Sequence, residues 1–332
     1  MPAPDNRPLF RFGDHVVAAA LPLTTLVRAT PGDGPPDITV SIQPLAAGHS
    51  APVEAWRHHW VERSGQNSLS LALEGSIHRL RFHDQCDFLI DVAAGSIRAE
   101  PAHGLSQETL EHLLVDQALP RLLSHWGELV THASVVDMGS AACAFIGHSG
   151  WGKSTLASLL RSAGHRLLSD DCALLRTDGA TVHALATYPS LRMYEDSIGQ
   201  TIYDTVDVSP VATYTNKLRV TVEHPAAGEH ASPPIRAIYL LNDPSREEAR
   251  HSIAAMAPME ACMALIEHSF RLDVTATQHT RLLLGQAAAV QRFAPVFHLR
   301  YPRDYRHSAR LLEVLHRHFD GLAAACAGHA DA

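Results

Sequence analysis

The stretch that most constrains the fold is Gly147-His-Ser-Gly-Trp-Gly-Lys153-Ser154. It fits the pattern G-x-x-x-x-G-K-[ST], in which a glycine-rich loop joins the end of a β-strand to the start of a helix. The apolar run Ala141–Ile146 precedes the loop, and the helix-forming residues Ser154–Ser162 follow it. This context favours the pattern over a chance match in a glycine-containing turn. It predicts an α/β fold that binds phosphate groups.

The residue types of the loop are those that a nucleotide site requires. Gly147, Gly150 and Gly152 permit backbone conformations that turn N–H groups toward phosphate oxygens. Lys153 can neutralise charge at the β- and γ-phosphates, and the Ser154 hydroxyl can ligate Mg²⁺. We expect ATP to contact the whole loop, which comprises Gly147, His148, Ser149, Gly150, Trp151, Gly152, Lys153, Ser154 and Thr155.

A pair of aspartates follows the next apolar run, His165–Ser169. Adjacent residues of a strand point to opposite faces, so Asp170 and Asp171 need not have the same role. One carboxylate could hold Mg²⁺ together with Ser154, and the other could accept the proton of an attacking hydroxyl. We favour Asp171 as the proton acceptor and Asp170 as the metal ligand, although the sequence leaves their order open. The alternative is a solvated strand end with a helix-capping role.

The bulk composition is that of a globular protein. The chain has 332 residues, of which 46% are apolar, so it is long enough for two domains and a buried core. Its formal net charge of −8 argues against a nucleic-acid partner, because such proteins normally present a basic surface. The five cysteines are odd in number and form no C-x-x-C pair, which predicts reduced, packed thiols.

The N-terminal stretch lacks the order of a signal peptide, in which a charged segment precedes an apolar one. Met1–Phe10 is polar, and the apolar run Val16–Val27 follows Asp14 and contains Pro22. This run is also too short to span a bilayer. We therefore expect a cytoplasmic protein with no membrane partner.

Short apolar runs broken by turn residues predict a β-rich N-terminal domain over residues 1–105, with substrate docking as its expected role. The runs are Val16–Val27, Ile38–Ile42, Leu69–Leu73, Ile77–Phe82 and Phe88–Val92. Leucines at three- and four-residue steps then predict a linking helix over residues 106–128, kinked at Pro120. Residues 129–332 form the expected catalytic domain. It begins with two apolar runs, Leu129–Val136 and Ala141–Ile146, read as neighbouring strands, and Asp178-Gly179 predicts a hairpin turn.

His132, on the first of these runs, would alone be read as a hydrogen-bonded core residue, since the chain contains 23 histidines. Together with the glycine-rich loop and Gly164-His-Arg-Leu-Leu-Ser-Asp-Asp171, however, it forms a pattern that resembles the catalytic domain of HPr kinase/phosphorylase. The resemblance covers residues 130–220 well. It implies a PEP-carboxykinase-like nucleotide fold that uses ATP and Mg²⁺ to phosphorylate a serine hydroxyl on a protein. His132 would orient an aspartate or contact the phosphates.

The chain departs from this family in two places. The family signature after the aspartate pair, an acidic residue followed by arginine and glycine, is replaced by Tyr188-Pro-Ser-Leu-Arg192-Met-Tyr-Glu195. Arg192 and Glu195 could take the cation and carboxylate roles or be surface residues. The N-terminal region also does not resemble the N-terminal domain of HPr kinase/phosphorylase. The resemblance therefore does not extend to regulation of sugar uptake through HPr or to the reverse phosphorylase reaction.

The arrangement is more similar to the divergent HPr-kinase-like proteins of peptide-tailoring clusters, which phosphorylate a serine near the C-terminus of a lasso-peptide precursor. The similarity is carried by Thr131-His-Ala-Ser134, Leu168-Ser-Asp-Asp171, Asn216-Lys-Leu-Arg219 and Leu299-Arg-Tyr-Pro-Arg-Asp304. It implies a peptide or protein substrate with a serine acceptor, and it leaves a homo-oligomer open. Lys217 and Arg219, two positions apart, would share one strand face and could clamp the transferred phosphoryl group, or form a solvated basic pair.

Two other functions are compatible with the same loop. The acceptor could be a free amino acid or another small hydroxyl compound, in which case the enzyme class is unchanged. A nucleotide-sensing scaffold is the second alternative, but the aspartate pair argues against it. A GTPase switch is disfavoured because Asn242-Asp243 lacks the base-reading pattern N-K-x-D. The leading hypothesis is an ATP- and Mg²⁺-dependent kinase whose catalytic residues are Asp171, Asp170, His132, Lys153, Lys217 and Arg219.

Overall fold

The computed structural model describes residues 7–45, 52–61, 65–185, 187, 190–202, 206–221 and 233–330. Tyr188 and Pro189, which belong to the stretch that replaces the family signature, lie outside the described residues. The chain divides into two compact units. The first comprises Met1–Gly127, Pro210–Asn216 and Phe270–Arg281, and the second Glu128–Ser209, Lys217–Ser269 and Leu282–Ala332.

The first unit is built on one nine-stranded sheet with the order β3-β1-β2-β4-β9-β8-β7-β6-β5. Its strands are β1 (Leu9–Phe12), β2 (His15–Ala19), β3 (Val27–Arg28), β4 (Ile38–Ile42), β5 (His58–Val61), β6 (Asn67–Glu74), β7 (Ile77–Phe82), β8 (Cys86–Asp91) and β9 (Ser96–Pro101). All nine strands of this sheet lie between Leu9 and Pro101. The apolar run Val16–Val27 contains two strands, because the chain turns between Ala19 and Val27, around Pro22.

The leucine-rich helical segment that follows is continuous but changes its winding. It consists of α1 (Gln107–Leu113), a π-helical turn (Leu114–Ala118) and α2 (Leu119–His125). Pro120 is the second residue of α2 and follows the π-helical turn directly. Proline has no N–H to donate to a preceding carbonyl oxygen of a helix. The proline is therefore accommodated by a change of helix type next to it.

The second unit contains a mixed six-stranded sheet with the order β13-β11-β12-β19-β21-β20. β12 pairs in parallel with β19, and β19 pairs in parallel with β21, whereas the outer pairs are antiparallel. The strands of this unit are β10 (Leu129–Thr131), β11 (Ala133–Asp137), β12 (Ala142–Ile146), β13 (Arg166–Ser169), β14 (Ala173–Thr177), β15 (Val182–Leu185), β16 (Ser190–Met193), β17 (Asp207–Pro210, its last residue in the first unit), β18 (Leu218–Thr221), β19 (Ile235–Leu241), β20 (Ser252–Ala255) and β21 (Val296–Arg300).

Two smaller sheets accompany it, β10-β14-β15 and β16-β18-β17. The hairpin expected at Asp178-Gly179 joins β14 to β15 and is confirmed. The helices are α3 (Lys153–Ser162), α4 (Glu195–Thr201), α5 (Pro258–Glu267), α6 (Thr277–Phe293, its first turn in the first unit) and α7 (Ser308–Ala330).

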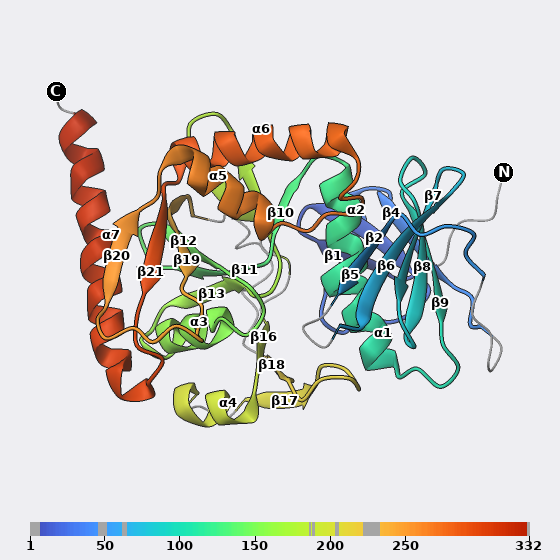
Figure 1. The fold of residues 1–332 in the computed structure, drawn as a ribbon, viewed down its shortest axis with the longest axis horizontal. Coiled ribbons are helices and arrows are strands. Elements are labelled where there is room, and N and C mark those ends of the chain that lie inside the picture. The colour runs from blue at the N-terminus through green and yellow to red at the C-terminus, as the bar shows by residue number, and fades with distance from the viewer. Residues whose placement is uncertain are drawn as a thin grey trace. The chain divides into compact units, whose positions relative to one another are not determined.

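Helices cover both faces of the six-stranded sheet (Figure 1). Along β12, Ala142, Ala144 and Ile146 point to one face, where α5 and α6 complete a buried core. Cys143 and Phe145 point to the other face and pack with residues of α3 and α7. This alternation follows from the two-residue period of a strand. It makes the strand that precedes the glycine-rich loop fully buried on both sides.

One expected strand is divided in the structure. The run Leu129–Val136 was predicted to form a single strand, but it forms β10 and β11, which belong to different sheets. His132 lies at the break, and its N–H donates to the carbonyl oxygen of His268, 2.7 Å away, instead of to a neighbouring strand of either sheet. The prediction of one strand is wrong because hydrophobicity alone does not show where a strand changes its partner.

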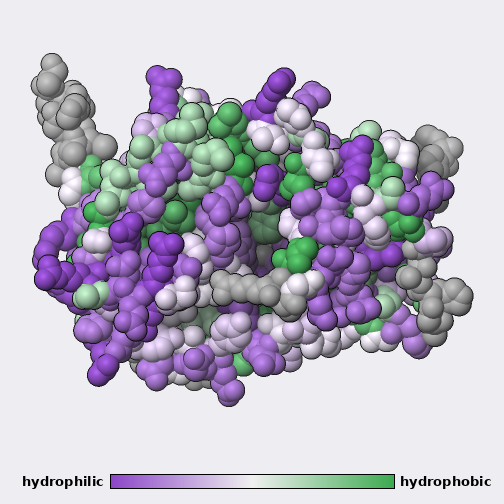
Figure 2. All heavy atoms as spheres, viewed as in Figure 1, coloured by the Kyte–Doolittle hydropathy of each residue, from purple (hydrophilic) through white to green (hydrophobic). Residues whose placement is uncertain are grey.

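The surface drawn in Figure 2 is predominantly hydrophilic, with hydrophobic residues over α5. These include Met259 and Met263, which are 69% and 54% exposed. In the described part of the chain, no helix is long and apolar enough to cross a membrane. The described cysteines, Cys86, Cys143, Cys172 and Cys262, are buried free thiols, as expected.

The support of the glycine-rich loop by β12 can be tested at Phe145. Its ring is fully buried and stacks on Tyr239 of β19, with 5.7 Å between ring centroids. We expect Phe145→Ala to lower the free energy of unfolding by about 3–5 kcal/mol, because it removes buried contacts and leaves a cavity. Urea denaturation measures the loss. The matched control is Leu284→Ala at a site 40% exposed, and an equal effect of both variants would contradict the proposed role of this core.

Candidate functional site

The candidate site is built where three parallel strands end. β12, β19 and β21 run in the same direction, so the segments after Ile146, Leu241 and Arg300 emerge at one edge of the sheet. In sheets of this kind, ligands bind beyond the carboxyl ends of the strands. The glycine-rich loop follows β12, and Tyr301-Pro-Arg-Asp304 follows β21. Segments far apart in the sequence therefore meet at this edge.

The loop has the backbone geometry expected for a phosphate cradle. Gly150 and Gly152 have φ angles of +82° and +84°, in the left-handed region that favours glycine. Helix α3 begins at Lys153, so its free N–H groups and the positive end of its dipole lie at the end of the loop. The Lys153 ammonium donates to the carbonyl oxygens of Gly147 and His148 at 2.8 and 3.1 Å.

Arg303 supports the loop and was not among the expected site residues. Its guanidinium donates to the Trp151 carbonyl oxygen at 2.7 Å and also to the Tyr301 hydroxyl and the Asn242 carbonyl oxygen. The φ angle of Gly152 favours glycine, and a Cβ atom there would lie 2.8 Å from Arg303 Nη1, so a larger residue would also displace this guanidinium. The feature that could point to Arg303 is its position shortly after β21, which lies in the same sheet as β12 and runs in the same direction.

A cavity of about 240 Å³ lies beside the loop. Its lining includes Lys153 and Ser154 of the loop, Asp171 after β13, Arg192 of β16, Lys217 before β18, and Arg303. Three of the predicted catalytic residues, Lys153, Asp171 and Lys217, therefore face one space. Most of the charged groups that line it are cationic, which suits an anionic ligand.

Asp171 adopts an unusual backbone conformation. Its φ angle is +63°, which is uncommon for a residue other than glycine and occurs mostly with asparagine and aspartate. One carboxylate oxygen lies 3.7 Å from Arg192 Nε, and the other lies 3.6 Å from His132 Nε2. The left-handed turn at Asp171 directs its carboxylate to the cavity, whereas Asp170 is directed into the protein.

Asp171 is held ionised. Burial opposes its charge, but His132, Arg192, Lys217 and Lys153 together keep the pKa of Asp171 below its usual range. Burial and the nearby Lys153 lower the pKa of His132 to about 4, against the opposing effect of Asp171, so the imidazole is neutral at pH 7. At neutral pH the arginine and the two lysines therefore stabilise the carboxylate.

His132 contacts the main chain of Asp171 as well as its side chain. Its Nδ1 lies 2.9 Å from the Asp171 carbonyl oxygen. Because a carbonyl oxygen only accepts hydrogen bonds, this nitrogen carries the proton of the neutral ring, and Nε2 is its unprotonated nitrogen. The geometry indicates that His132 fixes the backbone of Asp171 and does not serve as its charge partner.

Asp170 has a different setting from the one expected of a metal ligand. It is fully buried and does not line the cavity. One carboxylate oxygen accepts a hydrogen bond from the Ser134 hydroxyl, and the other accepts one from the Arg192 N–H at 3.1 Å. Burial and the charge of Asp171 raise the pKa of Asp170 to about 6. Both oxygens are thus engaged by the protein itself.

Of the other residues singled out in the sequence, Lys217 lines the cavity, whereas Arg219 and Glu195 do not. Lys217 Nζ lies 3.5 Å from the Ser149 hydroxyl of the loop and 5.7 Å from the centre of the Tyr194 ring. Arg219 is buried outside the lining of the cavity, directly opposite Arg192 in the β16–β18 pair. Glu195 is exposed at the start of α4 and does not line the cavity either.

Comparisons with known proteins give matches among solved structures. No family model matches the chain, and no curated protein matches it. Among solved structures, the HPr(Ser) kinase/phosphatase from Coxiella burnetii is similar over 57% of this chain and 97% of that chain, with 11% sequence identity and a TM-score of 0.30. The chemistry of the site is therefore argued from its own residues.

The buried Lys153 predicts a pH dependence of nucleotide binding. Burial lowers the pKa of Lys153 to about 8, so its ammonium loses charge above this pH in the free protein. Phosphate groups favour the charged form, and ATP binding should weaken by up to about tenfold per pH unit above pH 8. Calorimetric titrations with ATP between pH 7 and 9.5 measure this slope. The Lys153→Arg variant keeps its charge in this pH range, so its ATP affinity should not fall above pH 8. The same pH dependence in both proteins would exclude Lys153 as the cause.

Asp170 predicts a pH-dependent stability. Its pKa is raised in the folded protein, so the folded state binds more protons and stability falls as the pH rises from about 4 to about 6. Asp170→Asn removes this ionisation and should raise the free energy of unfolding at pH 8 by about 1–3 kcal/mol. Urea denaturation at pH 8 and pH 4 provides the comparison. The gain should be absent at pH 4, and a variant less stable than the wild type only at pH 8 would show that the carboxylate is stabilising.

Proposed function

We propose that the second unit is an ATP- and Mg²⁺-dependent kinase that transfers the γ-phosphoryl group to a serine or threonine hydroxyl. The observation that carries this proposal is the position of Asp171, an ionised carboxylate in the cavity that Lys153 of the glycine-rich loop, Arg192 of β16 and Lys217 before β18 also line. Phosphoryl transfer requires little covalent chemistry from the protein. It depends on positioning the reactants and on stabilising the charge of the transferred group.

The residues present fit a nucleoside triphosphate. The start of α3 supplies N–H donors, and Lys153, Lys217 and Arg192 supply positive charge around the same cavity. Lys153 would exchange its hydrogen bonds with the Gly147 and His148 carbonyl oxygens for phosphate oxygens. Arg303, which also lines the cavity, would keep the loop in place through the Trp151 carbonyl oxygen.

Oxygen ligands for Mg²⁺ are also present. The Ser154 hydroxyl lies at the start of α3 and lines the cavity, and Mg²⁺ in such sites commonly takes one or two protein oxygens together with phosphates and water. When bound, Mg²⁺ neutralises charge on the β- and γ-phosphates. We propose Ser154 as a ligand, and we propose that Asp170, whose oxygens are already engaged, positions Arg192 and Ser134.

Asp171 is proposed to orient the acceptor hydroxyl and to accept its proton as the oxygen attacks the γ-phosphorus. Its lowered pKa keeps it ionised and ready to accept a hydrogen bond from the hydroxyl. Lys217 and Arg192 would stabilise the charge of the transferred group. His132 is a positioning residue, because it acts on the backbone of Asp171.

The acceptor is proposed to be a serine near the C-terminus of a ribosomally made peptide, such as a lasso-peptide precursor, with the first unit as its docking domain. This part of the proposal is supported by the sequence resemblance described above. A free amino acid or another small hydroxyl compound is the alternative acceptor, and a nucleotide-sensing scaffold is the alternative function without transfer. The three differ in whether ATP is consumed and in which molecule gains mass.

The role of Asp171 can be tested with Asp171→Asn, which removes the charge and keeps the size. We expect phosphoryl transfer to fall by about 10²–10⁴-fold, because the hydroxyl loses its proton acceptor, while ATP binding is largely kept. Mass spectrometry follows a library of synthetic peptides ending in serine, the same peptides ending in alanine, and free serine, each incubated with ATP and Mg²⁺. The matched control is Glu247→Gln, an exposed carboxylate outside the cavity.

The outcomes separate the alternatives. Phosphorylation of serine-ending but not alanine-ending peptides would support the peptide kinase, and phosphorylation of free serine alone would favour the small-molecule alternative. Undiminished transfer by Asp171→Asn would refute the proton-acceptor role. Tight ATP binding without transfer to any of the acceptors would argue for the scaffold.

A further inference from the structure

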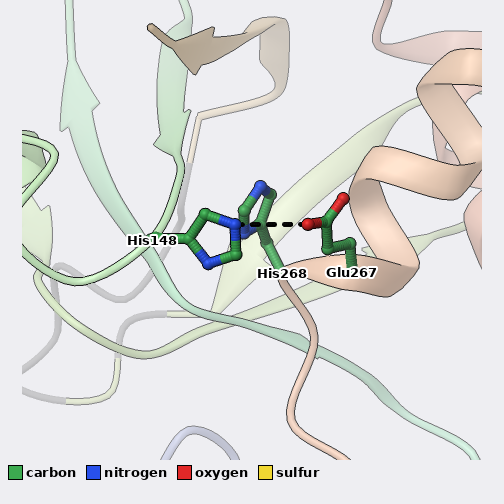
Figure 3. A group of neighbouring side chains, drawn as sticks. All are labelled: His148, Glu267 and His268. Atoms are coloured by element: carbon green, nitrogen blue, oxygen red, sulfur yellow. Dashed lines mark ion pairs between the residues drawn. The ribbon is translucent and has the colours of Figure 1, made fainter. Parts of the chain in front are cut away.

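Three side chains that can bind a metal ion converge next to the glycine-rich loop, apart from the cavity described above. His148 belongs to the loop, Glu267 is the last residue of α5, and His268 follows it (Figure 3). Figure 3 shows the His148 ring directed toward the Glu267 carboxylate, with the His268 ring alongside. None of the three lines the cavity beside the loop.

The geometry points to a zinc-type site formed by His148, Glu267 and His268, with an open fourth position. One potential ligand atom from each of the three side chains lies within 4.8 Å of the other two, and His148 Nε2 is 3.2 Å from Glu267 Oε1. In a tetrahedral zinc site with bonds of about 2.0–2.1 Å, neighbouring ligand atoms are about 3.4 Å apart. Small side-chain rotations therefore suffice to bring the three together around one ion.

The ligand types favour a transition metal over Mg²⁺ or Ca²⁺. Imidazole nitrogen suits zinc and related ions, whereas Mg²⁺ and Ca²⁺ prefer oxygen ligands. Two histidines and one glutamate also form a known open zinc-site composition, in which water or another ligand completes the tetrahedron. Among the residues that the structure describes, no other group of three histidine, cysteine or acidic side chains comes this close.

One ligand is fixed in place, and the other two can adjust. His268 is buried, and its carbonyl oxygen accepts the N–H of His132 at 2.7 Å. Trp151 packs near both imidazoles, with ring centroids 4.7 Å from His148 and 6.2 Å from His268. The side chains of His148 and Glu267 are 52% and 61% exposed, so they can close on an ion without disturbing the core.

A metal ion bound at this site would link two segments of the second unit. A bound ion would join the loop at His148 to the end of α5, and His268 is in turn joined to the strand break at His132. The metal would thus act as a clip that limits motion of the loop. This role differs from that of Mg²⁺ at the phosphates, and it does not depend on the identity of the acceptor.

The test uses the full chain and Zn²⁺ alone, without nucleotide. After treatment with chelator, equilibrium dialysis against Zn²⁺ with metal analysis should give one tight site per chain, and Zn²⁺ should raise the melting temperature. His148→Ala and Glu267→Gln should each lower the affinity for Zn²⁺ by at least ~100-fold. Loss of a residue that only hydrogen-bonds to a metal ligand already costs up to about 100-fold, and loss of a ligand should cost no less. Both residues are largely exposed, so the variants should fold.

The matched control is His298→Ala. His298 and Glu260 form a pair of the same kind, 2.8 Å apart, but among the described residues no third potential ligand lies beside them. This variant should bind Zn²⁺ as tightly as the wild type. Absence of a tight site in the wild type, an unchanged site in both His148→Ala and Glu267→Gln, or equal weakening by His298→Ala would overturn the proposal and reduce the cluster to a surface ion pair.

Discussion

The contact between His132 and the main chain of Asp171 is the constraint on which the candidate site depends. It joins the break between β10 and β11 to the end of β13, so two sheets meet at the residue that faces the cavity. A left-handed backbone at a residue other than glycine is unfavourable and persists only where its surroundings fix it. Here the surroundings include one imidazole and one arginine, and the turn places Asp171 instead of Asp170 at the cavity.

The same turn gives the two adjacent carboxylates opposite properties. Asp171 faces cations and stays ionised, whereas the buried Asp170 has its pKa raised by burial and by the charge of its neighbour. Two like charges side by side are costly unless their environments differ. Pairs of titratable groups with separated pKa values are typical of sites that move protons. The separation therefore agrees with a division of work, with Asp171 for the substrate and Asp170 for the support of Arg192 and Ser134.

Much of this arrangement could be predicted because it is local in the sequence. The strand, loop and helix around residues 141–162 follow from alternating burial, glycine positions and helix-forming residues, and all three elements are present. The loop's lysine and the aspartate pair were found by their spacing. The break at His132 could not be predicted, because the hydrophobicity of a run does not indicate which sheet each half of it joins.

Contacts between distant segments were also beyond the sequence. Arg303 lies about 150 positions after the loop, yet it donates to the Trp151 carbonyl oxygen and lies next to Gly152. The prediction that Asp170 binds the metal rests on an extended strand, in which alternate residues face opposite sides. The backbone is not extended at Asp171, so this premise does not hold. Periodicity describes regular elements, and the functional side chains lie where the elements end.

The loop is held by three groups with different chemistry. Lys153 binds the loop's own carbonyl oxygens and can exchange them for a ligand. Arg303 donates to the Trp151 carbonyl oxygen and also lines the cavity. His148 reaches Glu267 and His268, outside the lining of the cavity. Under the proposed function, phosphate oxygens would replace the carbonyl oxygens at Lys153, while the contacts of Arg303 and His148 hold the loop.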